Sequence, residues 1–264
     1  MDICYNVTQT PALYKVDGKS YTSPIMFNVR EDTGSIVGTV SQTYKLVDHK
    51  QTIHNTTTAL EIVGLHAKPT HTILDNGSRI ITEYLLKGKF QVMKKDDLLV
   101  KLVLFNSYDG STAVQFLFGL FRVICSNGAM IGERTFGTFK WYHRSYFSLP
   151  DFVEQIQAGI VNYKQLALDK IQVLADKKIT IDQGRQIVET LTMPGKGQIL
   201  PKKHYDTVFD YFANPRYDVD KKNMNLWTLF NAFTYTLTHE SDYNVAVQND
   251  FSGKIFNVLQ RKVA

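Results

Sequence analysis

The stretch Phe121-Arg122-Val123-Ile124-Cys125-Ser126-Asn127-Gly128-Ala129-Met130-Ile131-Gly132 lies between two segments of different composition. Before it, two apolar runs, Leu98 to Phe105 and Ser111 to Phe121, flank the pair Asp109-Gly110. Asp-Gly between apolar runs predicts a β-hairpin, because both turn residues tolerate a positive φ. After it comes a basic and aromatic segment, residues 140–146. We therefore expect an apolar strand, then a polar turn, then a cluster of cations and rings.

The rest of the N-terminal half also has the pattern of short antiparallel strands. Turn-forming pairs and triplets recur between apolar runs, at Asp17-Gly18, Thr33-Gly34, Asn76-Gly77 and Lys87-Gly88-Lys89. Residues 48–65 are the exception, since their apolar residues follow helical spacing behind Asp48, a suitable N-cap. We expect residues 10–45 and 70–140 to form a largely antiparallel sheet.

The C-terminal half has helical periodicity from Pro150 onward. One apolar face steps by three or four residues through Phe152, Ile156, Ile160, Tyr163, Ala167, Ile171 and Leu174. Thr180 and Gln183 have the spacing of a capping box, and further helices are expected at 202–213, 224–239 and 243–262. The sequence predicts an α+β protein with one domain, 1–264. Its β-rich part covers about 1–148, and its helical part, about 149–264, packs on it.

Three separated stretches resemble the phage and plasmid-like family called "domain of unknown function 932". The first runs from Val29 to Gly34 and on through Ser41-Gln42-Thr43-Tyr44. The second combines Ser107 to Gly110 with Phe121 to Gly128, and the third is Leu226 to Tyr235. The family label carries no activity. The resemblance implies an origin in a mobile element, where such proteins tend to occur near replication and recombination functions.

Composition sets bounds on the class of protein. Of 264 residues, 44% are hydrophobic and 21% charged, enough to bury a substantial core, and no apolar run approaches the ~20 residues of a membrane helix. We expect no signal peptide and a reducing compartment, the bacterial host cytoplasm, since Cys4 and Cys125 cannot form a disulfide framework. Cys125 is expected to be buried and inert. The net charge of +5 and the aromatic content of 12% suit a protein that stacks on bases and contacts phosphates.

Catalytic motifs are missing from the sequence. It has neither a phosphate-binding loop nor a Gly-x-Ser-x-Gly elbow, and its seven histidines are scattered. Asp96-Asp97 could indicate a two-metal nuclease, but a solvated turn beside Lys94-Lys95 explains the pair better. We therefore expect no enzyme activity, no cofactor and no metal site, although carboxylates that the fold gathers from distant segments leave no local motif.

The positive functional signal is the segment Lys140 to Tyr146. In a strand, alternate side chains share a face, so cations and rings alternate on one side, at Lys140, Tyr142, Arg144 and Tyr146. Trp141 and His143 would face the other side. Such a face suits phosphate contact combined with base stacking. The alternative is an edge strand whose tyrosines pack under a loop.

Other residues leave alternatives open. Arg122 interrupts an apolar run, so it either pairs with a buried carboxylate or faces a groove and contacts a phosphate. Asn127-Gly128 is expected to be a turn rather than a ligand site. A core stripe is expected in the last family-like stretch, with Asn231 and Thr234 in structural roles. Four lysines near β turns either extend the basic surface or are simply solvated: Lys87, Lys89, Lys94 and Lys95.

The leading hypothesis is a phage-encoded single-stranded DNA-binding protein that acts in replication, recombination or annealing. Trp141 is included with the cations and tyrosines above among the residues expected to contact the DNA. One alternative is a transcription-regulatory or anti-defence protein that binds host or phage RNA polymerase or another host factor. Another is a metal-dependent nuclease. The chain ends in a predicted amphipathic helix with Arg261 and Lys262, which we interpret as helix stabilisation or as a handle for replication or other protein partners.

Overall fold

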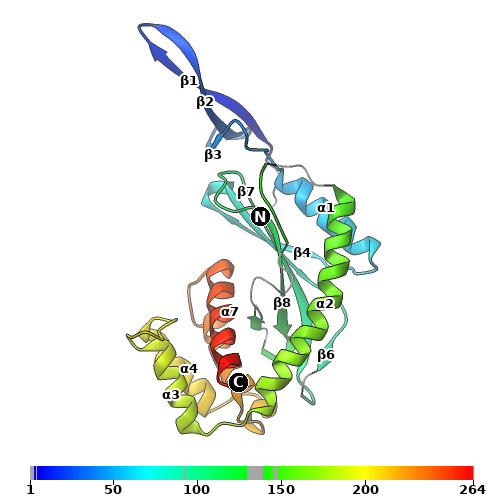
Figure 1. Ribbon diagram of the computed structural model, residues 1–264, viewed down its shortest axis with the longest axis vertical. Helices are drawn as coiled ribbons and strands as arrows, with labels where there is room; N and C mark the ends of the chain where they lie inside the picture. Colours follow the sequence, from blue (N-terminus) through cyan, green and yellow to red (C-terminus); the bar gives the residue numbers. More distant parts are fainter. Residues whose placement is uncertain are drawn as a thin grey trace. The chain divides into compact units, whose positions relative to one another are not determined.

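The computed structural model describes residues 3, 5–91, 93–125, 127–129, 139–144 and 148–263. Figure 1 shows the elements along the chain. The chain forms two compact units, each assembled from three segments. Unit 1 contains 1–85, 102–117 and 138–158, and unit 2 contains 86–101, 118–137 and 159–264. Both units therefore take residues from either side of residue 148, where the sequence suggested a division between a β-rich and a helical part of one domain.

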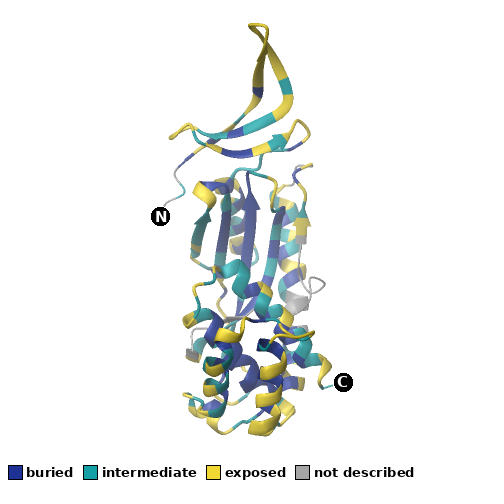
Figure 2. Ribbon diagram, turned by 90° about the vertical axis from the view of Figure 1, so that its left-hand side faces the viewer, coloured by how far each residue is buried: buried dark blue, intermediate teal, exposed yellow. Residues whose placement is uncertain are grey.

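Unit 1 begins with a three-stranded antiparallel sheet in the order β1-β2-β3. Its strands are β1 (Val7–Val16), β2 (Lys19–Arg30) and β3 (Ile36–Ser41). Asp17 and Gly18, at φ 49° and 75°, join the first two strands in the expected two-residue turn. β3 pairs with β2 only from Ile25 to Val29, so residues 13–22 form a two-stranded ribbon. The ribbon is largely exposed (Figure 2).

The second sheet has seven strands among the described residues, with the central order β10-β8-β7-β5-β4. Short β6 pairs with β7, and short β9 pairs with β8. The strands are β4 (Pro69–Leu74), β5 (Arg79–Leu85), β6 (Phe90–Gln91), β7 (Asp97–Ser107), β8 (Val114–Arg122), β9 (Asn127–Ala129) and β10 (Phe139–Trp141). Asn76-Gly77 lies in the short helix η1 (Asp75–Gly77) between β4 and β5, and Asp109-Gly110 lies between the neighbours β7 and β8.

Two turn predictions were wrong. Asn127 and Gly128 lie in β9, paired with Arg122 and Phe121, because the chain already reverses through the short helix η2 (Val123–Cys125). Lys87-Gly88-Lys89 does not close a hairpin, since the strand after it pairs with β7. The turn residues correctly indicated where a strand ends, but tertiary structure determines which strand the next segment pairs with. The side chain of Cys125 lies outside the described ones.

The helices follow the sequence expectations closely. α1 (His49–Ile62) begins at Asp48, whose carboxylate accepts from the amide of Gln51. The apolar period from Pro150 forms α2 (Leu149–Asp176), and the predicted capping box begins α3 (Ile181–Thr192). The remaining helices are η3 (Lys202–His204), α4 (Tyr205–Ala213), α5 (Asp218–Lys221), α6 (Leu226–His239) and α7 (Val245–Arg261). The fold class is α+β, as predicted.

Each unit has its own packed centre. In unit 1, Tyr5, Val7 and Val37 pack around Tyr108, which is 0% exposed. Gly38 lies so close to that tyrosine that a Cβ would stand 2.1 Å from its backbone oxygen. In unit 2, the predicted stripe on α6 is buried, and Phe230 packs edge-on against Phe256 of α7. No helix in the described part of the chain is both long enough and apolar enough to span a membrane.

Candidate functional site

The cation and ring segment begins on β10, an edge strand of the second sheet. Lys140 pairs with Gln115 and Trp141 with Val114 of β8, and this pairing sets the alternation of side chains. Lys140 and Tyr142 are exposed, Tyr142 by 64%, and the Lys140 ammonium lies 4.8 Å from the centre of the Tyr142 ring. That distance is within the range of a cation–π contact. The predicted alternation of exposed cation and ring is therefore present at these two residues.

The inward side of the same segment is part of the core of unit 1. The Trp141 ring stacks on Phe152 at 5.6 Å and meets Phe116 edge-on at the same distance. Both phenylalanines are 0% exposed. This packing explains how the strand is anchored, and we leave Trp141 out of the candidate surface. The strand also ends earlier than expected, at Trp141, and Tyr146 lies outside the described residues.

His143 anchors the turn that carries the exposed residues. Its ring, 7% exposed, stacks on Tyr44 at 4.5 Å. Nδ1 lies 3.2 Å from the oxygen of Lys45, and Nε2 lies 3.2 Å from the oxygen of Thr112. Burial lowers the pKa of His143, so the neutral ring donates one of these two hydrogen bonds at neutral pH. A buried anchor of this kind holds Tyr142 and the exposed Arg144 on either side of it.

Behind this anchor lies a buried polar layer of unit 1. The Tyr44 hydroxyl donates to the oxygen of Ser107 at 2.7 Å, within two of the family-like stretches. His49 stacks on Tyr108 at 3.8 Å, and its Nδ1 accepts from the Asn106 amide at 2.9 Å. Burial lowers the pKa of His49 to about 3, so its ring is neutral. These contacts are structural, since they join the turn between β7 and β8 to the start of α1.

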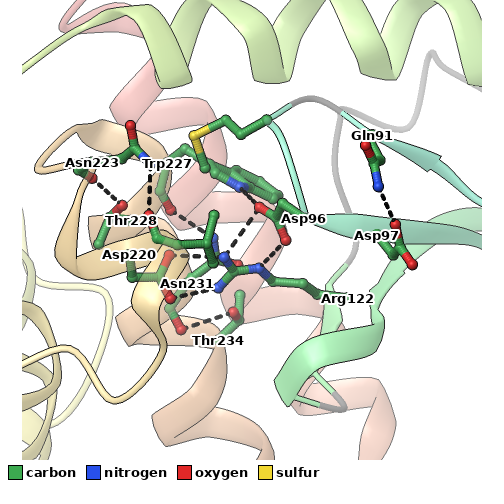
Figure 3. A network of polar contacts seen from close by, with 12 residues as sticks. Gln91, Asp96, Asp97, Arg122, Asp220, Asn223, Trp227, Thr228, Asn231 and Thr234 are labelled. Carbon is green, nitrogen blue, oxygen red and sulfur yellow. Dashed lines mark hydrogen bonds and ion pairs between the residues drawn. The ribbon is translucent and has the colours of Figure 1, made fainter.

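Arg122 belongs to a separate network in unit 2 (Figure 3). Its guanidinium, 3% exposed, donates from Nε and Nη2 to Asp96 at 2.6 and 3.1 Å. From Nη1 and Nη2 it donates to Asp220 of α5 at 2.9 and 2.8 Å. Asp96 also accepts from Nε1 of Trp227 at 2.8 Å. Of the two alternatives for Arg122, the structure therefore shows pairing with buried carboxylates. This pairing leaves no exposed edge of the guanidinium for a phosphate.

The charges of this network do not balance. One guanidinium faces two buried carboxylates, so the group carries an excess negative charge. Burial raises the pKa of Asp220, the hydrogen bonds and charge of Arg122 lower it, and the charge of Asp96 raises it again, with a net increase. Burial alone would lower the pKa of Arg122, but its two carboxylate partners raise it, so the arginine stays charged. The network joins the start of β7, the end of β8 and the helices α5 and α6.

A narrow cleft opens beside this network. Its lining includes Arg122, Asp220, Asn231 and Tyr235. Tyr211 of α4 and Arg216 of the following loop also line it. Its free interior is about 20 Å³, room for a single water. The guanidinium of exposed Arg216 lies 4.5 Å from the Tyr211 ring centre. The cleft offers no room for a larger ligand.

The remaining predicted basic residues are exposed and belong to unit 2. Lys89 pairs with Asp97 at 3.0 Å, whereas Lys95 adopts a positive φ of 69° in the turn before β7. The set also includes Lys87 and Lys94 and, at the end of α7, Arg261 and Lys262. Lys140, Tyr142 and Arg144 thus lie within a few residues of one another in unit 1, whereas the other predicted basic residues belong to unit 2.

Asp96 and Asp97 do not share a site. Asp96 is 0% exposed and faces Arg122, whereas Asp97 accepts from Gln91 (Figure 3). Asp97 also accepts from Lys89. Within the part of the chain that the structure describes, no group of three histidine, cysteine or acidic side chains is placed to hold a metal ion.

Sequence reasoning missed one aromatic pair. Tyr14 and Tyr21 stack across the β1–β2 ribbon, with ring centres 5.6 Å apart. The signal was available, because a two-residue turn at Asp17-Gly18 places residue 14 opposite residue 21.

Comparison with known proteins agrees with the resemblance. The family model "Domain of unknown function (DUF932)" matches residues 36–257. The chain belongs to the DUF932 family. The match includes the second and third family-like stretches, which supply Arg122 and α6, and the Ser41 to Tyr44 part of the first. The β1–β2 ribbon and Val29 to Gly34 precede it.

Two curated relatives of this DUF932 chain come from Escherichia coli strain K12. The "UPF0380 protein YafZ" is 26% identical over 159 residues, which cover 60% of this chain and 55% of that protein. The "UPF0380 protein YfjQ" is 24% identical over the same shares. The chain thus spans about half the length of the curated relatives it matches. No solved structure matches it.

Proposed function

We propose that this DUF932 protein binds single-stranded DNA and acts in replication, recombination or annealing for a phage or another mobile element. One observation carries the proposal: the exposed side chains of Lys140, on β10, and Tyr142, one residue beyond its end, are in contact, while Trp141 between them is packed in the core. A ring held in place loses little freedom when a base stacks on it, and the neighbouring ammonium can contact the phosphate.

The electrostatic balance of the chain supports the same function. The net charge is +5, and the exposed Arg144 follows Tyr142 after one buried residue. A polyanion therefore meets a surface of favourable sign. Base stacking on a ring requires unpaired bases, so single strands are expected to bind more tightly than duplex DNA of equal length at the same salt.

The test is a titration of the full chain with labelled oligothymidylate at two salt concentrations. Tyr142→Ala should weaken binding by ~1–3 kcal/mol, the range for loss of one stacked base. Lys140→Ala or Arg144→Ala should reduce the dependence of log affinity on log salt by about 0.7 for each lost phosphate contact. A matched control is Tyr235→Ala in unit 2, a partly exposed tyrosine outside the candidate surface.

Three results would contradict the proposal. They are no binding by the wild-type chain, equal or tighter binding of duplex DNA, and affinity that falls only in parallel with melting temperature. Metal-dependent cleavage of the oligonucleotide would instead favour a nuclease.

A further inference from the structure

The tip of the β1–β2 ribbon exposes large side chains that no packing within the described chain accounts for. Leu13 is 69% exposed, Tyr14 51%, Val16 49% and Tyr21 44%. A two-stranded ribbon gains little stability from such residues, because each stands on a face without a third layer. Exposed rings and apolar side chains grouped on one protruding element indicate a contact with another molecule.

The strand register sorts these side chains between two faces. Tyr14 pairs with Tyr21, and Val16 pairs with Lys19, so alternation puts all four on one face. The other face carries Leu13 and Lys15 opposite Thr22 and Ser20. On the first face the two tyrosine rings are nearly parallel, inclined by 24° with centres 5.6 Å apart, and Lys19 lies two residues before Tyr21. The rings leave no room for a base between them, so a base can stack only on an outer face of the pair, which we call the tyrosine platform.

The β1 edge of this sheet is poorly suited to bind by adding a strand. β1 is an edge strand of its sheet and contains Pro11, which cannot donate a ladder hydrogen bond. The pairing with β2 is also irregular between Pro11 and Leu13, and an exposed lysine follows at Lys15. Prolines, bulges and lysines are the features that discourage pairing between edges. The ligand is therefore expected to meet a face of side chains rather than the backbone edge.

We propose that the face formed by Tyr14, Tyr21 and Lys19 is a second contact for single-stranded nucleic acid, with bases stacked on the tyrosine platform and a phosphate at the lysine. This inference rests on the proposed function and extends it to an element that precedes the family match. It repeats the combination found at Lys140 and Tyr142, a ring beside a cation, in the same compact unit. Charge favours this ligand, since Lys19 is the one charged residue among the four that alternation places on this face.

The experiment compares ribbon variants of the full chain in the oligothymidylate titration. Tyr14→Val with Tyr21→Val removes both rings and keeps residues that favour strands, and binding should become roughly 5- to 100-fold weaker. Lys19→Gln should lower the salt slope by about 0.7, whereas Lys15→Gln, which removes the same charge from the opposite face, should leave it unchanged. Photocrosslinking of an oligonucleotide with 5-iododeoxyuridine should label the peptide that contains Tyr14 or Tyr21.

The outcomes separate this inference from the proposed function. If Tyr142→Ala weakens binding while the ribbon variants bind normally and no ribbon peptide is crosslinked, the second contact is wrong and the proposed function stands. If the wild-type chain binds no oligonucleotide, both are wrong. If the tyrosine variant changes the sedimentation coefficient at unchanged affinity, the face joins copies of the chain, which also overturns the inference. Equal loss of affinity in Lys15→Gln and Lys19→Gln would contradict the assignment to one face.

Discussion

Replacing Arg122 by methionine tests the network of buried charges in unit 2. Methionine keeps much of the volume of the side chain but removes four hydrogen bonds to two carboxylates, which are 0% and 7% exposed at Asp96 and Asp220. Breaking a buried pair in this way costs ~3–5 kcal/mol, because an uncompensated charge stays buried. We expect Arg122→Met to lose about this much free energy of unfolding at pH 7.

Protonation of a buried aspartate limits the loss of unfolding free energy in Arg122→Met and makes that loss depend on pH. An aspartate can escape burial of its charge by taking up a proton, which costs about 4 kcal/mol at pH 7 for a reference pKa of ~3.9. At pH 5 the same step costs about 1.5 kcal/mol. Burial already raises the pKa of Asp220, and loss of Arg122 removes the partner that lowers it, so stability relative to wild type is lost as pH rises and recovered as it falls. Between pH 7 and pH 5, the difference between the two proteins should shrink by up to ~2.7 kcal/mol through protonation of Asp220.

Urea unfolding at pH 5 and pH 7, followed by circular dichroism, measures both effects. Arg216→Met is the matched control, because that arginine is exposed in the same unit and its cation–π contacts contribute at most ~1 kcal/mol. Adding Asp96→Asn and Asp220→Asn to Arg122→Met should restore part of the lost stability, although it changes three residues. The reasoning is refuted if Arg122→Met unfolds within ~0.5 kcal/mol of wild type, or if its deficit is the same at both pH values.

Two further predictions concern the other unit and the end of the chain. The pKa of His49 in the folded protein is depressed to about 3, so its contribution to stability is complete above pH 6.5 and is lost as pH falls. In urea unfolding, wild type should therefore lose ~3 kcal/mol more stability than His49→Gln between pH 7 and pH 4. The double substitution Arg261→Glu with Lys262→Glu should leave oligonucleotide affinity within about twofold if these residues act as a handle for a protein partner, with loss of that partner in pull-downs. A fall in DNA affinity would instead place both residues on the nucleic-acid surface.

The sequence determined the local structure of this protein to a large extent. Helix α1, the long α2 and the capping box before α3 were all predicted, because periodicity and caps depend on residues within a few positions of one another. Two hairpin turns, at Asp17-Gly18 and Asp109-Gly110, were predicted for the same reason. The opposite placement of Lys140 and Trp141 also follows from strand geometry alone.

Tertiary structure decided which residues meet. Arg122 could have paired with a carboxylate or faced a groove, and only the fold brings Asp96 and Asp220 to it, from 26 and 98 residues away along the chain. The partner of β6 and the position of the reversal before β9 were likewise settled by pairing between distant strands. Burial of a charge depends on everything that surrounds it, so a sequence pattern marks Arg122 as unusual, but its neighbours in space determine whether it is a ligand-binding group or part of the core.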